Sequence, residues 1–310
     1  MLQRHFYTAG LAVYITLSAP YLPLHHIRLM KIRDDKKDYA DLKKAVELLE
    51  TPSITAQISN LIGSPIEFVV AKLPKFASKK INSIVIAALN KSASAGLWSL
   101  DNEPGRTSST KINKLYAAIS GAAGGAFGFI ALGIELPITT TIMMRAVADV
   151  ARSEGFDLED FDTKQACIEV FALGGKSSSD DSSDTGYYAV RSFTTQTMRH
   201  LSKELAELAA KQTTKNAQKL VAEQSGKWLA TLIEKVAARF GVVVTEKFAA
   251  QAVPVVGAFT GASINLLFTD FYQDMARGHF IVKRLERTYG FDEVKDAYKQ
   301  IRKPDRGARA

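Results

Sequence analysis

The 310-residue chain contains very little cysteine and histidine, with one of the first and five of the second. A single cysteine, Cys167, excludes an internal disulfide and any structural zinc site built from several cysteines. Cys167 lies in the amphipathic stretch QACIEVFAL, where we expect buried packing rather than nucleophilic chemistry. Only His200 and His279 follow Met30, and neither has a His or Cys at ligand spacing. Asp270 and Asp274 could pair with His279, but we expect a surface histidine on a charged helix. The sequence therefore predicts no metal site and no cofactor.

Strong catalytic motifs are also missing. Gly175-Lys176-Ser177 resembles the end of a phosphate-binding loop, but Val170 stands where that loop needs its first glycine. The glycine cluster at 121–128 follows a helical segment rather than a strand, so it is no dinucleotide fingerprint. No Gly-x-Ser-x-Gly elbow occurs. A hydrolase acting on a lipid or peptide, with Glu135 as general base, is the alternative to a non-catalytic protein.

Charge is modestly basic, with 40 Lys and Arg against 32 Asp and Glu. A net charge of +8 favours anionic surfaces, although the interleaved acids also fit a charge that serves solubility. Aromatic and basic residues do not alternate in the way that nucleic-acid-binding surfaces require, so we expect no nucleic-acid partner. We expect Lys75, Lys79 and Lys80 of KFASKKIN to dock on anionic lipid. The prediction from charge is a protein that binds peripherally to an anionic membrane surface.

Two uncharged, glycine-studded stretches cover residues 115–134 and 248–269. Each approaches the roughly 20 apolar residues that span a bilayer, but both are rich in small residues. Gly121/Gly125 and Gly257/Gly261 are four apart, so each pair shares a helix face and permits close approach of a second backbone. Each mid-helix glycine costs about 1 kcal/mol against alanine. Close packing of two central helical hairpins therefore accounts for them, with lipid contact as the alternative.

Periodicity predicts an all-α protein, a multi-helix bundle, because no convincing run of alternating strand residues occurs. Pro137 is expected to begin a helix and Asp162 to cap one. The other expected helices begin or end at similar signals, and the full set covers residues 35–50, 65–74, 81–100, 137–152, 163–173, 187–211, 217–240, 254–287 and 291–302.

The domain organisation follows from composition. Residues 30–302 are expected to form one helical domain, with a polar mobile loop at 174–186 and a disordered basic tail at 303–310. Residues 1–29 form an extension that contains a short apolar centre interrupted by prolines. It is either a weak anchor or a segment before a true start at Met30.

A weak internal sequence similarity suggests a pseudo-repeat. Gly-Ala-Phe at 125–127 precedes Gly-Phe-Asp at 155–157, and Gly-Ala-Phe at 257–259 precedes Gly-Phe-Asp at 290–292. The hypothesis is that the two glycine-rich units are equivalent.

Polar residues that bound or interrupt these stretches form the candidate site. Buried charges should be paired, because burying one alone is costly. The simplest interpretation is a structural Glu135–Arg145 ion pair. The functional one is a polar cluster that binds a head group or a small polar ligand, made of Glu135, Arg145, Asp149, Asn265 and Asp270.

Two segments carry a family resemblance. GAAGGAFGFIALGIELPITTTIMMRAVADVARSEGFD and the later AVPVVGAFTGASINLLFTDFYQDMARGHF resemble the EcsC protein family. The Glu-Leu-Pro-x-Thr-Thr core, the following Met-x-Arg and the Pro-x-x-Gly-Ala…Ile-Asn element carry the match, which covers about residues 30–302. The family is named for a bacterial gene beside an ABC-transporter pair. Together with the basic charge, the resemblance implies a non-catalytic, cytoplasmic protein bound peripherally to the inner membrane, or to a transporter there, in an accessory role. It names no reaction.

Overall fold

The computed structural model describes residues 31–63, 65–73, 75–98, 104–105, 128–174, 186–192, 214–251 and 257–302. The chain divides after Met30 into two units, and all of these residues belong to the second. Their regular structure is entirely helical, which confirms the all-α prediction. The extension at 1–29, residues 175–185 of the expected loop, the tail and most of the first glycine-rich stretch lie outside the described residues.

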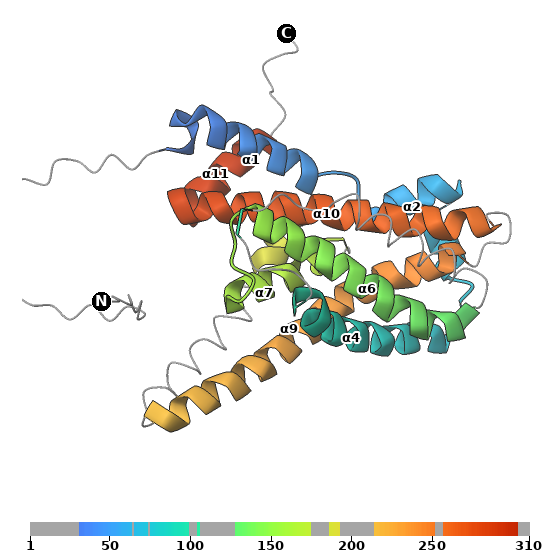
Figure 1. Ribbon diagram of the computed structural model, residues 1–310. Helices are drawn as coiled ribbons and strands as arrows, with labels where there is room; N and C mark the ends of the chain where they lie inside the picture. The colour runs from blue at the N-terminus through green and yellow to red at the C-terminus, as the bar shows by residue number, and fades with distance from the viewer. Residues whose placement is uncertain are drawn as a thin grey trace, which may run out of the picture. The chain divides into compact units, whose positions relative to one another are not determined.

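The helices follow one another along the chain and are labelled as in Figure 1. They are η1 (Ile32–Asp34), α1 (Lys36–Leu49), α2 (Ile54–Ile62), α3 (Ile66–Val70), α4 (Lys75–Trp98), α6 (Gly128–Ser153), α7 (Phe161–Glu169), η2 (Val170–Ala172), α9 (Thr214–Gln251), α10 (Gly257–Tyr289) and α11 (Phe291–Arg302). Within the described part of the chain, no helix is long and apolar enough to cross a bilayer.

Local signals explain several helix ends. The Asp35 side chain caps α1 by accepting the backbone N–H groups of Lys37 and Asp38. Ser53 caps α2 in the same way, and Gly63 ends that helix with a φ of 69°, a left-handed conformation that glycine adopts without strain. The start of α1 agrees with the helix expected at 35–50, whereas α2 was not among the expected helices.

The prediction that Pro137 begins a helix is wrong, because α6 continues through it. A proline inside a helix loses one hydrogen bond and crowds the carbonyl four residues earlier. That carbonyl belongs to Gly133, around which a Cβ would meet nothing within 4 Å, so the preceding turn has room to adjust. Leu136, Thr139 and Thr140 are buried on either side of the proline. Tertiary packing therefore keeps the helix continuous.

Three other boundaries differ from expectation. Asp160, not Asp162, is the N-cap residue of α7, and Asp162 lies in the first turn where it still complements the helix dipole. Helix α4 begins at Lys75, earlier than expected. Helix α9 extends to Gln251 and so takes in the start of the second glycine-rich stretch. Buried Val243, Val244 and Ala249 continue its core-facing side and explain the extension.

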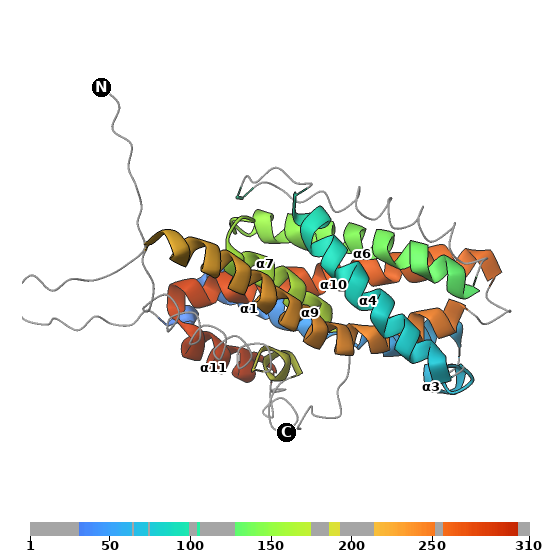
Figure 2. The same cartoon turned by 90° about the horizontal axis from the view of Figure 1, so that it is seen from below.

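The core lies where α4, α6, α9 and α10 pack against one another (Figures 1 and 2). Aromatic side chains join the elements near its middle. Phe171 of η2 stacks on Tyr272 of α10 with ring centroids 5.2 Å apart, and its edge meets Phe240 of α9 at 5.1 Å. A second cluster, around Tyr187, Tyr188 and Tyr298, fills the space between α1, α10 and α11.

Helices α6 and α10 are parallel and aligned over most of their length. Asn265 of α10 donates to Glu135 of α6, and further on Arg284 donates to Glu154 just after α6. Both contacts join residues 130 positions apart. Because the separation is the same at both places, the two helices run in the same direction without slipping in register.

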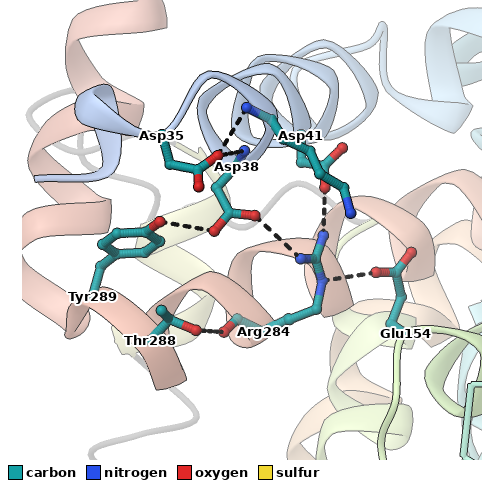
Figure 3. A network of polar contacts seen from close by, with 8 residues as sticks. Asp35, Asp38, Asp41, Glu154, Arg284, Thr288 and Tyr289 are labelled. Atoms are coloured by element: carbon teal, nitrogen blue, oxygen red, sulfur yellow. Dashed lines mark hydrogen bonds and ion pairs between the residues drawn. The ribbon is translucent and has the colours of Figure 1, made fainter. Parts of the chain in front are cut away.

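The Arg284 network joins three parts of the chain (Figure 3). Its guanidinium lies 2.7 Å from Asp41 and 3.6 Å from Asp38, both on α1, and 3.1 Å from Glu154. The Tyr289 hydroxyl donates to the other side of Asp38 at 2.8 Å. Burial and the neighbouring Asp38 raise the pKa of Tyr289 to about 12, so this donor stays protonated at neutral pH. The network fastens α1 across α10 and the end of α6.

The same α1–α10 contact depends on a glycine. A Cβ built on Gly278 would lie 2.6 Å from Leu49 Cγ and 3.1 Å from the carbonyl oxygen of Ala45. We predict that Gly278→Ala lowers the free energy of unfolding by about 1–3 kcal/mol, since the two helices must separate or repack. Gly226→Ala is the control, because a Cβ there meets nothing within 4 Å. It should stabilise α9 by up to about 1 kcal/mol. Urea denaturation of both variants measures this, and equal effects would contradict the close approach at Gly278.

Candidate functional site

A buried polar centre lies between α6, α9 and α10. The Lys247 ammonium is 2.9 Å from Glu135 Oε1, and the Asn265 amide donates to the same oxygen at 3.3 Å. All three side chains are buried. The ammonium also lies 5.5 Å from the centroid of the Phe268 ring, which attracts it through the face of the ring. One carboxylate thus links α6 to α9 and α10, through residues 112 and 130 positions further along the chain.

The charges in this centre are satisfied mainly by one another. Isolated burial of either ion would be strongly unfavourable, but paired and hydrogen-bonded ions can be held in the interior. The Asn265 side-chain oxygen has no hydrogen-bond partner among the described residues, and neither has the Thr140 hydroxyl. These atoms can accept a bond from water or from a polar ligand. In this arrangement Glu135 serves as an anchor for a cation.

The five residues of the expected polar cluster do not all meet. Glu135 and Asn265 are in contact, as the functional interpretation requires. Arg145 lies ten residues further along α6, about 15 Å along the axis, so the ion pair of Glu135 is made with Lys247 instead. Asp149 is fourteen residues from Glu135, about 21 Å, and pairs with Arg152. Asp270 follows Asn265 by five residues, which turns it about 140° around α10.

Lys247 is the member that sequence reasoning missed. It immediately precedes the second uncharged stretch, in VVVTEKFAAQ, and could have been noticed as the last cation before that stretch. Nothing in the sequence says that it faces Glu135, because 112 residues separate them. Arg152, the partner of Asp149, was likewise passed over, although an acid and a base three residues apart on a helix are neighbours.

A second buried polar cluster surrounds His279. Its Nδ1 lies 3.1 Å from the Tyr187 hydroxyl, and its Nε2 lies 3.8 Å from Glu169 Oε2. Burial, together with the positive charges of Lys283 and Arg191, holds the pKa of His279 well below its usual value despite the nearby carboxylate. Burial also raises the pKa of Tyr187, so its hydroxyl remains a donor to the neutral ring. The sequence had placed His279 on a charged helix surface, and this is wrong: it is fully buried.

Cys167 is buried, as expected. Burial raises the pKa of its thiol to about 12. The thiolate that nucleophilic chemistry requires is therefore scarce at neutral pH. Among the described residues, no group of three His, Cys, Asp or Glu side chains is placed to hold a metal ion.

An exposed corner at α2, α3 and the start of α4 contains both apolar and basic side chains, and we call it the lysine-rich corner. Phe68 is 71% exposed and Leu61 is 43% exposed. Lys72, Lys79 and Lys80 are exposed in the same stretch of chain. Residues 61–80 carry four lysines against one acid, Glu67. The backbone places Lys75 at the first position of α4, and its side chain lies outside the described residues.

The architecture defines an all-helical protein whose interior contains a paired carboxylate and ammonium beside parallel helices. The Glu135 that anchors this centre stands in the ELPITT segment on which the family resemblance was based. Residues 36–285 match the model of the EcsC protein family, and the chain therefore belongs to that family. Comparison with curated proteins and with solved structures gave no match.

The Glu135–Lys247 pair makes a direct stability prediction. Lys247→Met leaves a buried carboxylate without its cation and should lower the free energy of unfolding by about 3–5 kcal/mol. Glu135→Gln should have an effect of similar size, whereas the double variant should lose less than the sum of the two. Urea denaturation of the four proteins measures the coupling. Lys227→Met, at an exposed position of α9, is the control and should change stability by less than about 0.5 kcal/mol. If the losses in the free energy of unfolding of the two single variants simply add in the double variant, Glu135 and Lys247 do not interact.

The burial of His279 predicts that the free energy of unfolding depends on pH. The unfolded imidazole takes up a proton below about pH 6.5, while the buried ring stays neutral. The free energy of unfolding should therefore be unaffected by this group above pH 6.5 and fall below it, by up to about 1.4 kcal/mol per pH unit. Urea midpoints at several pH values between 7.5 and 5 should decline more steeply for the wild type than for His279→Gln. Parallel profiles would show that the ring can be protonated in place.

Proposed function

We propose that this protein is a non-catalytic, cytoplasmic helical protein that binds peripherally to the inner membrane. The observation that carries the proposal is the lysine-rich corner, where Phe68 is 71% exposed in a segment that also carries exposed lysines. An aromatic side chain costs free energy when it faces water, and this cost is relieved when the ring enters the interface between lipid head groups and acyl chains.

The corner combines the two forces that hold peripheral proteins on membranes. Phe68 and Leu61 supply apolar area that can enter the interface. Lys72, Lys79 and Lys80 supply positive charge, and each lysine near an anionic surface contributes about 1 kcal/mol. Neither contribution is large alone, so the proposal requires both on the same face. Reversible, salt-sensitive association is the expected behaviour.

The state of Glu135 supports the non-catalytic role over the hydrolase alternative. A general base must come within hydrogen-bond reach of a substrate proton. Glu135 is buried, and its Oε1 atom already accepts from both Lys247 and Asn265. A carboxylate paired with an ammonium in the interior is better suited to joining helices than to proton abstraction.

The family resemblance suggests a partner, since the family is named for a gene beside an ABC-transporter pair. We propose that the membrane-bound protein acts as an accessory to such a transporter or to another envelope process. The pseudo-repeat belongs to the same proposal. It is supported by Gly155 and Gly290, which follow α6 and α10 with φ values of 86° and 87° and each precede a Phe-Asp dipeptide. Paired, equivalent units around the parallel α6 and α10 would form the rigid body that presents the corner.

Charge neutralisation tests the docking. Lys79→Gln combined with Lys80→Gln should weaken binding to vesicles containing phosphatidylglycerol about tenfold or more, since two lysines contribute about 2 kcal/mol. High salt should have a similar effect on the wild type. Vesicle sedimentation at low salt measures both. Phe68→Ser should weaken binding with little change in its salt dependence.

The matched control neutralises another adjacent lysine pair. Lys36 and Lys37 are exposed on α1, so replacing both by Gln changes the net charge equally but leaves the corner intact. Its binding should stay close to that of the wild type. If the two double variants behave alike, net charge rather than the corner drives association. If the wild type stays in solution with anionic vesicles at low salt, the docking proposal fails.

A further inference from the structure

A groove of about 600 Å³ runs between α3, α4 and α9. Its size falls within the range of small-molecule sites. Gly241 lies in it, and a Cβ there would meet the Asn82 side-chain oxygen at 3.0 Å, so the glycine lets α4 and α9 approach at this point. The apolar part of the lining consists of small or branched aliphatic residues, namely Val70, Ala71, Ala238 and Val242. A narrow aliphatic chain matches such walls better than a bulky ring does.

Among the residues that the structure describes, the charged side chains that line the groove are both acidic. These are Glu67 and Glu246, and no described lysine or arginine joins them. This is unusual for a chain with a net charge of +8. The Thr55 hydroxyl donates to Glu246 Oε2 at 2.7 Å and so fixes that carboxylate against α2. An occupant that presents a positive group to these carboxylates, and an apolar group to the aliphatic walls, is complementary to the groove.

The groove and the lysine-rich corner share the same short elements. Glu67 lines the groove and Phe68, the next residue, is exposed at the corner. Ser78 lines the groove and is followed by exposed Lys79 and Lys80. Val242, on the wall of the groove, is itself 46% exposed. The open side of the groove and the lysine-rich corner are therefore built on the same part of the chain.

These observations point to a lipid whose head group carries one positive and one negative charge. We propose that the groove binds a zwitterionic phospholipid with a phosphoethanolamine head group. One acyl chain lies against Val70, Ala71, Ala238 and Val242, and the primary ammonium bonds to Glu67 and Glu246. The phosphate remains at the rim, towards Lys79, which is about 60° from groove-lining Asn82 around α4. This assignment rests on the proposed membrane docking, because the corner brings the groove to the lipid surface.

A soluble short-chain lipid tests the groove separately from docking. Dihexanoyl phosphatidylethanolamine, used below its micelle concentration, should bind the full-length protein saturably in a calorimetric titration. Dihexanoyl phosphatidylglycerol, which lacks the ammonium, should bind at least tenfold more weakly. Ala238→Phe fills the groove from an exposed helix position and should reduce phosphatidylethanolamine binding at least tenfold. Glu67→Gln should reduce the difference in affinity between phosphatidylethanolamine and phosphatidylglycerol.

Matched controls separate a groove effect from a general one. Ala230→Phe and Glu234→Gln change exposed residues of α9 that do not line the groove, and both should bind like the wild type. Equal affinity for the two head groups, or unchanged binding by Ala238→Phe, would overturn the proposal. A shift in the monomer–dimer equilibrium by Ala238→Phe, measured by sedimentation without lipid, would show that a second copy covers the groove and would also overturn it.

The two proposals fail in different ways. If the short-chain lipid binds as expected but anionic vesicles do not retain the protein, the groove proposal is supported and the docking proposal is wrong. If vesicles retain the protein through Lys79 and Lys80 but the short-chain lipid does not bind, docking stands and the groove proposal falls.

Discussion

The ion pair between Glu135 and Lys247 is the interaction on which the interior of this protein depends. It lies where α6, α9 and α10 meet, and Asn265 completes it from the third helix. A buried charge needs its partner in place, so these helices have little freedom to slide. The Arg284 network applies a similar constraint near the other end of α6 and α10, with the same separation of 130 residues. Two polar contacts thus set the register of two long parallel helices whose apolar faces alone would tolerate slippage.

This rigid interior separates structural from surface roles. The conspicuous ionisable groups of the core, Glu135, Lys247 and His279, are occupied with one another or held neutral by burial. The features that could meet another molecule lie on α2, α3, α4 and α9, where exposed Phe68 and lysines adjoin a groove with acidic and aliphatic walls. The proposed docking at a lipid surface uses these exposed groups, whereas the buried ion pair holds the helices together.

Much of the fold was accessible from sequence. The absence of alternating patterns predicted an all-α chain, and the last helix was placed at its observed bounds, 291–302. The errors came where tertiary packing overrode a local signal. Pro137 normally begins a helix, but buried neighbours carry α6 through it. The charged residues around His279 suggested an exposed face, yet Tyr187 and Glu169, distant in sequence, enclose the ring.

The candidate site shows the same division. Glu135 bounds one uncharged stretch and Asn265 interrupts the other, and these positions were enough to mark both residues as buried and polar. A polar group in an apolar stretch needs a partner when it is buried. The identity of the partner was not accessible, since Lys247 lies 112 residues from Glu135 and its direction depends on how α9 packs against α4 and α10. The groove beside the lysine-rich corner is likewise formed by three separate helices. Periodicity therefore determined the helical content, the two motif-bearing segments pointed to the family, and the uncharged stretches marked the residues that need partners. Only the tertiary structure decided which partners they have, because contacts between distant segments depend on helix packing rather than on local sequence.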